Sequence, residues 1–326
     1  MSSSPSIPSD RLTQVLDALR TTLNRVVVGQ EETVDTLVAA YLAGGHALLE
    51  GVPGIAKTLL ARAFASSLGL EMARIQFTPD LMPADVLGTN VFDSNSGTFR
   101  LVRGPIFTEI LMADEINRTP PKTQSALLEA MQEGRVTLDG TSHELPTGFF
   151  VIATQNPLEF EGVYPLPEAQ LDRFLVKIAM GLPGPEAELT ILRRAVAGEL
   201  AGWNEQVALP SAVASREEAL ALRHAAAHVH VGEELLAYLS RLAAAARTSA
   251  HVELGVSPRA TLALLSLARA SALLEGRTFA VPDDFKRFLE PCWAHRLLLT
   301  SEAELEGFTA RRILDDAANA VPVPHR

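Results

Sequence analysis

Five short apolar runs that alternate with helical stretches constrain this chain more than any other feature of its sequence. The runs are HALLE (46–50), ARIQF (73–77), ILMAD (110–114), FFVIAT (149–154) and FLVKIAM (174–180). Strands joined by helical or loop crossovers run parallel, and helices then cover both faces of their sheet. We therefore predict an α/β fold with a mostly parallel, five-stranded sheet.

The strand-like runs end near residue 180, where a segment rich in glycine and proline follows at 181–188. Such a segment is typical of a hinge or domain boundary. Apolar spacing predicts one amphipathic helix before the sheet and five after this segment, at 10–27, 186–200, 215–229, 233–248, 259–275 and 283–297. The sequence thus predicts a disordered leader (1–10), an α/β core (11–182) and an all-helical domain (183–326).

Charge and composition narrow the partners and the compartment. The 326 residues carry a net charge of −11 and a pI of about 5.3, which disfavours binding of nucleic acid mainly through phosphate contacts. No run of 18 apolar residues is present, so we expect no membrane contact. The single cysteine, Cys292, cannot form an internal disulfide, and we expect a reducing cytoplasm.

The loop after the first apolar run has the composition of a phosphate-binding loop that begins a helix. It consists of Gly51, Val52, Pro53, Gly54, Ile55, Ala56, Lys57, Thr58 and Leu59. Backbone N–H groups in such a loop converge on an anion, Lys57 supplies charge for the β- and γ-phosphates of ATP, and Thr58 supplies a hydroxyl for Mg²⁺. The alternative is a chance glycine-rich turn with a surface lysine.

Three loop positions differ in what they require of the backbone. Gly51 and Gly54 are predicted where positive φ or close phosphate approach excludes a side chain. Ala56 stands where the usual pattern has its last glycine. We expect helical dihedrals at Ala56, because it abuts the helix, and hence little cost from its methyl group.

Two later strands end in polar residues at the same edge of the sheet, where ligands of open α/β sheets bind. Asp114 and Glu115 follow the third apolar run. Asp114 is predicted to hold Mg²⁺, and Glu115 to orient and deprotonate the attacking water. Asn156 follows the fourth run and is a candidate to bind the water or the γ-phosphate, although an Asn-Pro turn also arises from loop chemistry alone.

Two insertions have the pattern of β-hairpins. In the first, the apolar residues Val91, Phe92, Phe99 and Leu101 flank the turn-rich sequence DSNSG. In the second, GRVTLDGTSHEL, Asp139 and Gly140 give the preferred dipeptide of a type I′ turn. Each hairpin is a candidate for substrate contact or, alternatively, a cover for an edge of the sheet.

Six motifs in order carry a resemblance to a known family. They are VVVGQE (26–31), GVPGIAKT (51–58), DEINR (114–118), ATQNP (153–157), LPEAQLDRF (166–174) and GVSPRA (255–260). Together they resemble the MoxR family of AAA+ ATPases, from about Leu12 to Leu299. The resemblance implies an AAA+ core with two β-hairpin inserts, followed by an all-helical lid domain. An alanine before the loop lysine is common in that family.

The resemblance also implies roles for single residues. Val28 and Gly29 resemble the adenine-side element, and Asn156 resembles the first sensor. Arg173 resembles an arginine finger that reaches the γ-phosphate held by a neighbouring subunit, and Arg259 resembles the second sensor. An arginine supplied in trans makes activity depend on assembly.

Local alternatives remain for both arginines, and one further residue has a weaker match. The alternative for Arg173 is a pair with Asp172, and for Arg259 it is an ordinary helix-start arginine after a proline. Gln76 resembles the polar switch residue that contacts the base glutamate.

The function implied is that of a Mg²⁺-ATP hydrolysing homo-oligomeric ring, expected to be a hexamer. The resemblance implies a chaperone-like role in maturing or activating protein complexes, beside partners with a von Willebrand A domain, with the hairpins as candidates for client contact. One alternative is a nucleic-acid motor or loader, which the acidic charge disfavours. The other is a nucleotide-gated scaffold without turnover, against which Glu115, Asn156 and Arg173 argue.

Overall fold

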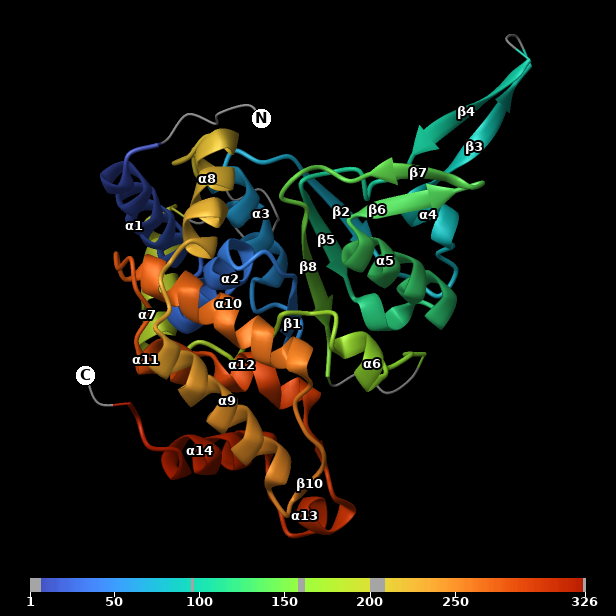
Figure 1. The fold of residues 1–326 in the computed structure, drawn as a ribbon. Coiled ribbons are helices and arrows are strands. Elements are labelled where there is room, and N and C mark those ends of the chain that lie inside the picture. The colour runs from blue at the N-terminus through green and yellow to red at the C-terminus, as the bar shows by residue number, and fades with distance from the viewer. Residues whose placement is uncertain (1–6, 95–96, 158–161, 200–208, 325–326) are drawn as a thin grey trace.

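A five-stranded parallel sheet lies at the centre of the computed structural model, which describes residues 7–94, 97–157, 162–199 and 209–324 (Figure 1). Its strands in spatial order are β2 (Met72–Gln76), β5 (Ile110–Asp114), β8 (Phe150–Gln155), β1 (Ala47–Glu50) and β9 (Val176–Ala179). Every neighbouring pair is parallel. The five predicted strands and their parallel arrangement are therefore confirmed.

Helices cover both faces of the sheet, which explains why its strands are apolar at successive positions rather than alternate ones. On one face, Leu49 and Met112 join a cluster with α1 (Ser9–Val26), α2 (Glu31–Leu42) and α3 (Lys57–Ser67). On the other face, Leu48 and Ala113 pack with α5 (Pro121–Glu133). The sheet is thus a buried middle layer. Of the predicted leader, 1–6 lie outside the described residues, and α1 already begins at Ser9.

Both predicted hairpins are present beside this core. The first pairs β3 (Gly88–Asp93) with β4 (Thr98–Arg103) and extends away from the sheet, with 95–96 of its turn outside the described residues (Figure 1). The second pairs β6 (Arg135–Leu138) with β7 (Thr141–Glu144), and Asp139 and Gly140 at its turn have φ of 48° and 79°, as a type I′ turn requires. Asn90 Nδ2 donates to Asp139 Oδ2 at 2.7 Å, so the two hairpins touch.

The chain after the sheet is mainly helical, as predicted. Its longer helices are α7 (Pro185–Val196), α8 (Arg216–Ala227), α9 (Glu233–Thr248), α10 (Pro258–Leu274) and α14 (Ala310–Ala320). The end predicted for the first of these, at residue 200, lies outside the described residues, and α7 ends at Val196. Elements not predicted from the sequence are helix α14 and the short β10 (Val252–Leu254), β11 (Leu298–Leu299) and α13 (Ser301–Leu305). Three further short elements are α4 (Pro83–Leu87), η1 (Ile116–Arg118) and α6 (Glu168–Leu171).

The single helix predicted at 283–297 is wrong. The structure has three short pieces there, α11 (Pro282–Arg287), α12 (Leu289–Trp293) and the 3₁₀ turn η2 (Ala294–Arg296). Pro291 has no N–H to donate to the carbonyl of Arg287, so a continuous helix loses a bond at that point. Phe288 accommodates the break with φ −110° and ψ 9°.

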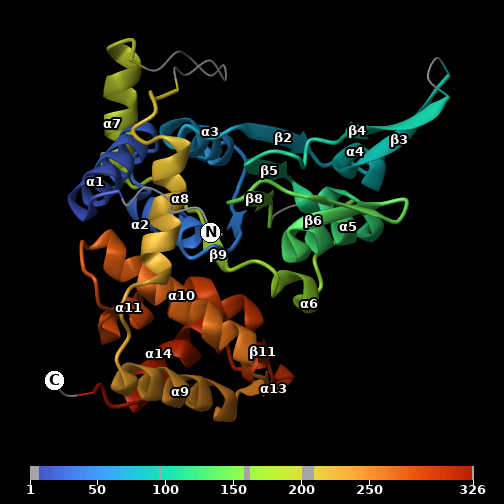
Figure 2. The same cartoon turned by 45° about the horizontal axis from the view of Figure 1, so that its top comes forward.

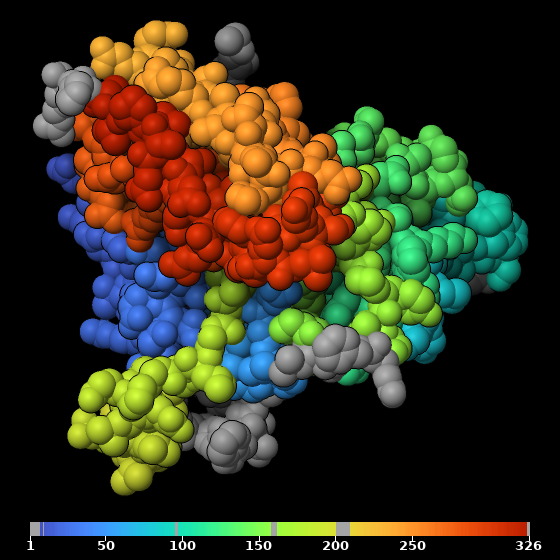
Figure 3. All heavy atoms as spheres, turned by 90° about the horizontal axis from the view of Figure 1, so that it is seen from below, coloured from blue at the N-terminus to red at the C-terminus, as the bar shows by residue number. Residues whose placement is uncertain are grey.

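The helical region packs closely on the core except at α7. One continuous hydrophobic cluster includes residues of α1, α2 and α3 together with residues of α8, α9 and α10. Helix α7 instead stands out from the molecule and buries none of its residues (Figures 2 and 3). The domain boundary at 182/183 falls between β9 and α7 and stays a prediction. Among the described residues, no helix is long and apolar enough to cross a membrane.

Candidate functional site

The loop between β1 and α3 needs glycine at two positions, for different reasons. A Cβ on Gly51 would lie 2.3 Å from Cδ1 of Ile55 and 2.8 Å from the carbonyl oxygen of Met180, so close packing excludes it. A Cβ on Gly54 would meet no atom within 4 Å, but φ there is +84°. Gly54 is therefore required by its backbone conformation rather than by space.

The prediction of helical dihedrals at Ala56 is wrong. Ala56 has φ 67° and ψ 24°, in the left-handed region, and α3 begins only at the next residue. A left-handed residue other than glycine costs roughly 1–2 kcal/mol. Left-handed residues in such a loop turn backbone N–H groups toward one concave side, the geometry that binds an anion. The methyl group of Ala56 is accommodated in spite of that backbone.

Lys57 and Thr58 occupy the first turn of α3, and both are half-buried. Lys57 Nζ donates to the carbonyl oxygen of Gly51 and, at 3.4 Å, to that of Val52. The ammonium group therefore lies over the loop, at the positive end of a helix dipole. Both features attract an anion to the same place.

Thr154 on β8 holds the two acids that follow β5. Its hydroxyl donates to Asp114 Oδ1 at 2.6 Å and accepts from the backbone N–H of Glu115 at 2.8 Å. Thr154 is fully buried, and Glu115 adopts a left-handed φ of 57°. One hydroxyl thus fixes both a carboxylate and the turn that carries the other. The sequence assigns no role to Thr154, the last residue of the fourth apolar run.

Strand β2 contributes two side chains that contact these acids. Gln76 Nε2 donates to Glu115 Oε2 at 2.6 Å, so the contact expected from the resemblance is present. Arg74 was not predicted, and it bridges Asp114 Oδ2 at 2.8 Å and Gln76 Oε1 at 3.2 Å. Residues two apart on a strand share a face, which is the one signal in the sequence that points to Arg74. Arg118 adds an ion pair to Glu115 at 3.3 Å.

The carboxyl ends of three adjacent strands bring the predicted residues together. Asn156 follows β8 directly and is buried, and the N–H of Gly51 after β1 donates to the carbonyl oxygen of Gln155 at 3.3 Å. The loop, the two acids and Asn156 therefore lie together at the carboxyl ends of these strands.

Gly29 lies against α7, because a Cβ there would lie 2.6 Å from Cβ of Ala187. Val28 precedes it and is half-buried.

Arg173 lies at the amino ends of the parallel strands, whereas the loop lies at their carboxyl ends. β9 runs parallel to β1, with Val176 opposite Ala47 and Ala179 opposite Glu50. Arg173 precedes β9, whereas the loop follows β1, so the four residues of β9, about 13 Å of strand, separate the two levels. The alternative of a pair with Asp172 is not what the structure has, since the Asp172 carboxylate pairs with Arg296 at 2.7 Å.

Arg259 is the second residue of α10 and is exposed. The adjacent residue fixes this end of the helix, because Trp293 Nε1 donates to the carbonyl oxygen of Ala260 at 2.9 Å. Its position after Pro258 is also that of an ordinary helix-start arginine, as the alternative had it.

Comparison with known proteins identifies the family. A model of the ATPase family associated with various cellular activities matches residues 46–176, and a model of the AAA lid domain matches 244–317. The uncharacterized protein YeaC of Bacillus subtilis is 44% identical over 93% of this chain and 92% of its own. The Chaperone MoxR1 of Mycobacterium tuberculosis is 40% identical over 93% and 80%. The chain belongs to the MoxR family of AAA+ ATPases.

A solved structure of the same fold supports this membership. A putative ATPase from Cytophaga hutchinsonii superposes with a TM-score of 0.87, at 38% identity over 97% of both chains. The activity of this MoxR-family chain is therefore ATP hydrolysis, and it binds nucleotide. Residues 46–176 contain the loop, both acids, Asn156 and Arg173, while the lid match contains Arg259.

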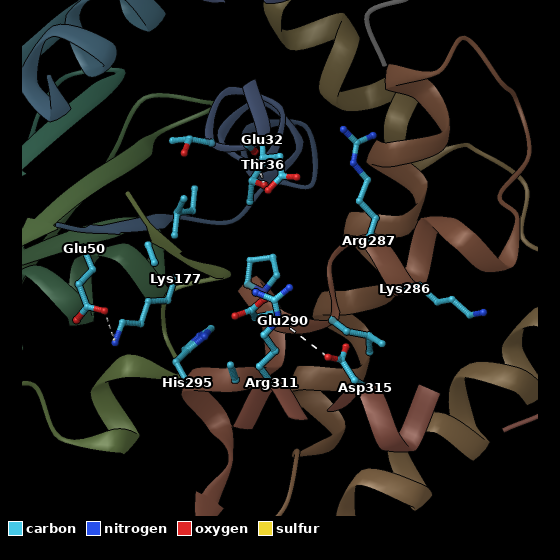
Figure 4. Close-up of a pocket in the computed structure, with 16 residues that line it drawn as sticks. Glu32, Thr36, Glu50, Lys177, Lys286, Arg287, Glu290, His295, Arg311 and Asp315 are labelled. Atoms are coloured by element: carbon cyan, nitrogen blue, oxygen red, sulfur yellow. Dashed lines mark hydrogen bonds and ion pairs between the residues drawn. The ribbon is translucent and has the colours of Figure 1, made fainter. Parts of the chain in front are cut away.

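A cavity of this MoxR-family chain begins next to the phosphate loop but is separate from it. It measures about 760 Å³ and lies between the core and the lid (Figure 4). Glu50, the residue before the loop, lines the cavity and pairs with Lys177 at 3.0 Å, while Lys286, Arg287 and Asp315 line it from the lid (Figure 4). Among the described residues, its lining includes none from 51–58. The cavity belongs to the junction of core and lid, not to the phosphate loop.

Proposed function

We propose that the protein is a Mg²⁺-dependent ATPase that works as a homo-oligomeric ring, a hexamer, and remodels client protein complexes in the cytoplasm. The observation that carries the ring is the separation of Arg173 from the loop by the length of β9. A site whose transition-state arginine stands at the far edge of its own sheet needs a second subunit to complete it. The arrangement is head-to-tail, so it closes into a ring when the rotation per subunit allows.

The residues at the loop fit a magnesium nucleotide. Carboxylate and hydroxyl oxygens are the ligands Mg²⁺ prefers, and Asp114 and Thr58 offer them, although Arg74 pairs with Asp114 in this structure. The metal ion, when bound, neutralises charge on the β- and γ-phosphates. Residues 51–59 bind the phosphates, with Lys57 as the point charge.

Hydrolysis requires a base, a water-orienting group and charge stabilisation. Glu115 takes the proton from the attacking water, and Asn156 orients that water. Gln76 holds the Glu115 carboxylate, so release of that hydrogen bond frees the base. Val28 and Gly29 border the adenine, next to the start of α7.

Arg173 and Arg259 stabilise the transition-state charge in the neighbouring subunit's site. The two arginines sit on segments joined to one another, because α12 and η2 contact both the start of α10 and the turn before β9. That shared anchorage favours action in trans for Arg259 as well as for Arg173. Two preorganised guanidinium groups then act together in a site closed to water.

The proposed client is a protein complex, beside a partner with a von Willebrand A domain. The name of the 40%-identical mycobacterial relative describes that protein as a chaperone. The exposed pair Phe92 and Phe99 on the first hairpin offers an apolar contact for a protein, with relative exposures of 55% and 72%. The hairpins are accordingly the client-contacting elements.

Trapping the ATP-bound ring tests the proposal. Glu115→Gln should bind ATP like the wild type, assemble into a larger species and hydrolyse at least ~100-fold more slowly, because the base is lost. Tagged Glu115→Gln protein held in ATP should retain a client protein that the wild type releases. Glu302→Gln, at an exposed acid on α13 of the lid rather than on a hairpin, is the matched control and should behave as wild type.

Three outcomes would contradict the proposal. Near-normal hydrolysis by Glu115→Gln would remove that residue from its role. A monomer at all nucleotide concentrations would remove the ring. Retention of nucleic acid in place of protein, lost on nuclease treatment, would identify a nucleic-acid motor instead.

A further inference from the structure

Arg296 of η2 forms several hydrogen bonds with the turn that carries Arg173, more than a simple ion pair would make. Its Nε donates to Asp172 Oδ1 at 2.7 Å. Its Nη2 donates to the carbonyl oxygens of Asp172 at 3.1 Å and Phe174 at 2.7 Å. Its Nη1 donates to the carbonyl oxygen of Cys292, also at 2.7 Å. One guanidinium therefore holds the backbone carbonyls of the residues on both sides of Arg173.

The burial of this contact shows that it is built into the fold. The Arg296 side chain is 4% exposed, whereas that of its partner Asp172 is 30% exposed. A buried guanidinium is tolerated only where a charge and several acceptors satisfy it. The planar fork of arginine can serve these acceptors at once, and a lysine ammonium cannot.

Neighbours of Arg296 reinforce the same turn and reach the other arginine. The ring of His295 bonds the carbonyl oxygen of Phe174 through Nε2 at 3.2 Å, and burial lowers the pKa of His295 to about 3, so the ring stays neutral. Trp293, three residues before Arg296, holds the carbonyl of Ala260 beside Arg259. The segment 293–296 of the lid thus touches the backbone next to both proposed trans arginines.

We propose that Arg296 is a positioning residue that holds the Arg173 turn so that Arg173 reaches the ATP of the neighbouring subunit. The inference rests on the proposed function, in which Arg173 acts in trans. It adds that the lid of one subunit, through η2, sets the position of Arg173 in the nucleotide site of the neighbouring subunit. A displacement of the lid then alters catalysis in the adjacent site, because misplacing a catalytic group by about 1 Å costs on the order of 100-fold in rate.

Trans-complementation separates this role from a general effect on folding. Arg296→Met subunits alone should bind ATP within about twofold of wild type yet hydrolyse it about 100-fold more slowly. They should regain hydrolysis when mixed with Glu115→Gln subunits, which cannot hydrolyse ATP but supply an intact Arg173 turn. They should not regain it when mixed with Arg173→Ala subunits, which lack the same contribution.

The reference mixture is Arg173→Ala with Glu115→Gln. Random mixing makes about one in four interfaces productive, and the Arg296→Met mixture should reach the same rate as this reference. Arg287→Met is the matched control: Arg287 also ties the lid to the core through Asp35, which keeps Arg20 as a second partner, and it does not touch the Arg173 turn. This control should keep its rate within about twofold. If Arg296→Met fails to fold, Arg296→Lys is used in the same mixtures.

Each unfavourable result has a distinct meaning. If the reference mixture hydrolyses ATP and the Arg296→Met mixture does not, Arg296→Met also damages the nucleotide site of its own subunit. The inference is then wrong. Near-wild-type hydrolysis by Arg296→Met alone also overturns it. If the reference mixture itself stays inactive, the trans role of Arg173 in the proposed function is wrong, and the inference is overturned with it.

Discussion

At the scale of single residues, the phosphate loop combines positions that tolerate a side chain with positions that do not. Gly51 is fixed by packing against Ile55 and Met180, and Gly54 by a positive φ. Ala56 shares the left-handed backbone of Gly54 while keeping its methyl group. The loop therefore holds strain at the residue next to Lys57, where function requires a particular backbone.

Ala56→Gly should raise the free energy of unfolding by about 1 kcal/mol, because glycine adopts the left-handed backbone without the steric cost. Urea unfolding without nucleotide measures this change. Ala244→Gly, at an exposed position inside α9, is the control and should lower the same quantity by about 1 kcal/mol. A fall in both variants would contradict the strain at Ala56. The affinity for ATP should stay within about tenfold, or 1.4 kcal/mol.

Residues joined by tertiary contacts were harder to predict than those in the loop. Asp114 and Glu115 were predicted from the strand that precedes them. Thr154 and Arg74, which hold Asp114, lie 40 residues away from it in opposite directions along the chain. Only the parallel pairing of β2, β5 and β8 brings them within hydrogen-bond distance.

At the scale of elements, one buried histidine ties three of them together. His46, just before β1, accepts from the N–H of Val151 on β8 through Nδ1, and its Nε2 donates to the carbonyl oxygen of Met131 on α5, both at 3.1 Å. Burial lowers the pKa of His46 to about 4. The neutral ring is therefore the form that the fold requires.

This histidine should make the fold sensitive to acid. The folded pKa of about 4 is below the unfolded value of 6.5, so its contribution to stability is complete above pH 6.5 and is lost as pH falls toward 4. Between pH 7.5 and 5.5 the wild type should lose about 1 kcal/mol more unfolding free energy than His46→Gln, which has no such titration. Urea unfolding at both pH values measures the difference. Equal losses would show that His46 does not titrate in this window.

The first hairpin is an element whose apolar residues face solvent instead of a core. The rings of Phe92 and Phe99 contact edge to face with centroids 5.3 Å apart. Aromatic pairs of this kind stabilise a hairpin modestly, and exposed ones also supply contact area for a partner.

Replacing both aromatic residues, Phe92→Ser with Phe99→Ser, should weaken client retention by Glu115→Gln rings at least ~10-fold, as loss of an interface hot spot does. The basal rate of ATP hydrolysis in the otherwise wild-type chain should stay within about twofold, since the pair lies outside the nucleotide site. Leu262→Ser, at an exposed leucine on α10, is the control and should change neither quantity. Unchanged client retention would leave the hairpin without a role in binding.

At the scale of the whole molecule, the sheet separates Arg173 from the phosphate loop. The loop, both acids and Asn156 meet at one edge, and Arg173 lies at the other. The lid packs across the core and reaches the Arg173 turn through Arg296. A subunit built in this way holds its phosphate loop at one end of the strands and Arg173 at the other.

Arg173→Ala should therefore poison mixed rings. Each variant subunit binds ATP normally but deprives its neighbour of transition-state charge, so added variant should depress the hydrolysis rate of wild-type protein below simple dilution. Titration of variant into wild type at constant total concentration measures this effect. A rate that falls only in proportion to the wild-type fraction would show that Arg173 does not act in trans.

The sequence by itself determined the strands, most helices, both hairpins, the phosphate loop and the two acids. Each of these depends on periodicity or on residues adjacent in the chain, which local physics specifies. Tertiary structure decided the left-handed Ala56, the break in the helix predicted at 283–297 and the clamp of Arg296 on a turn 124 residues earlier. Such features arise from contacts between distant segments, and no local pattern encodes which segments will meet.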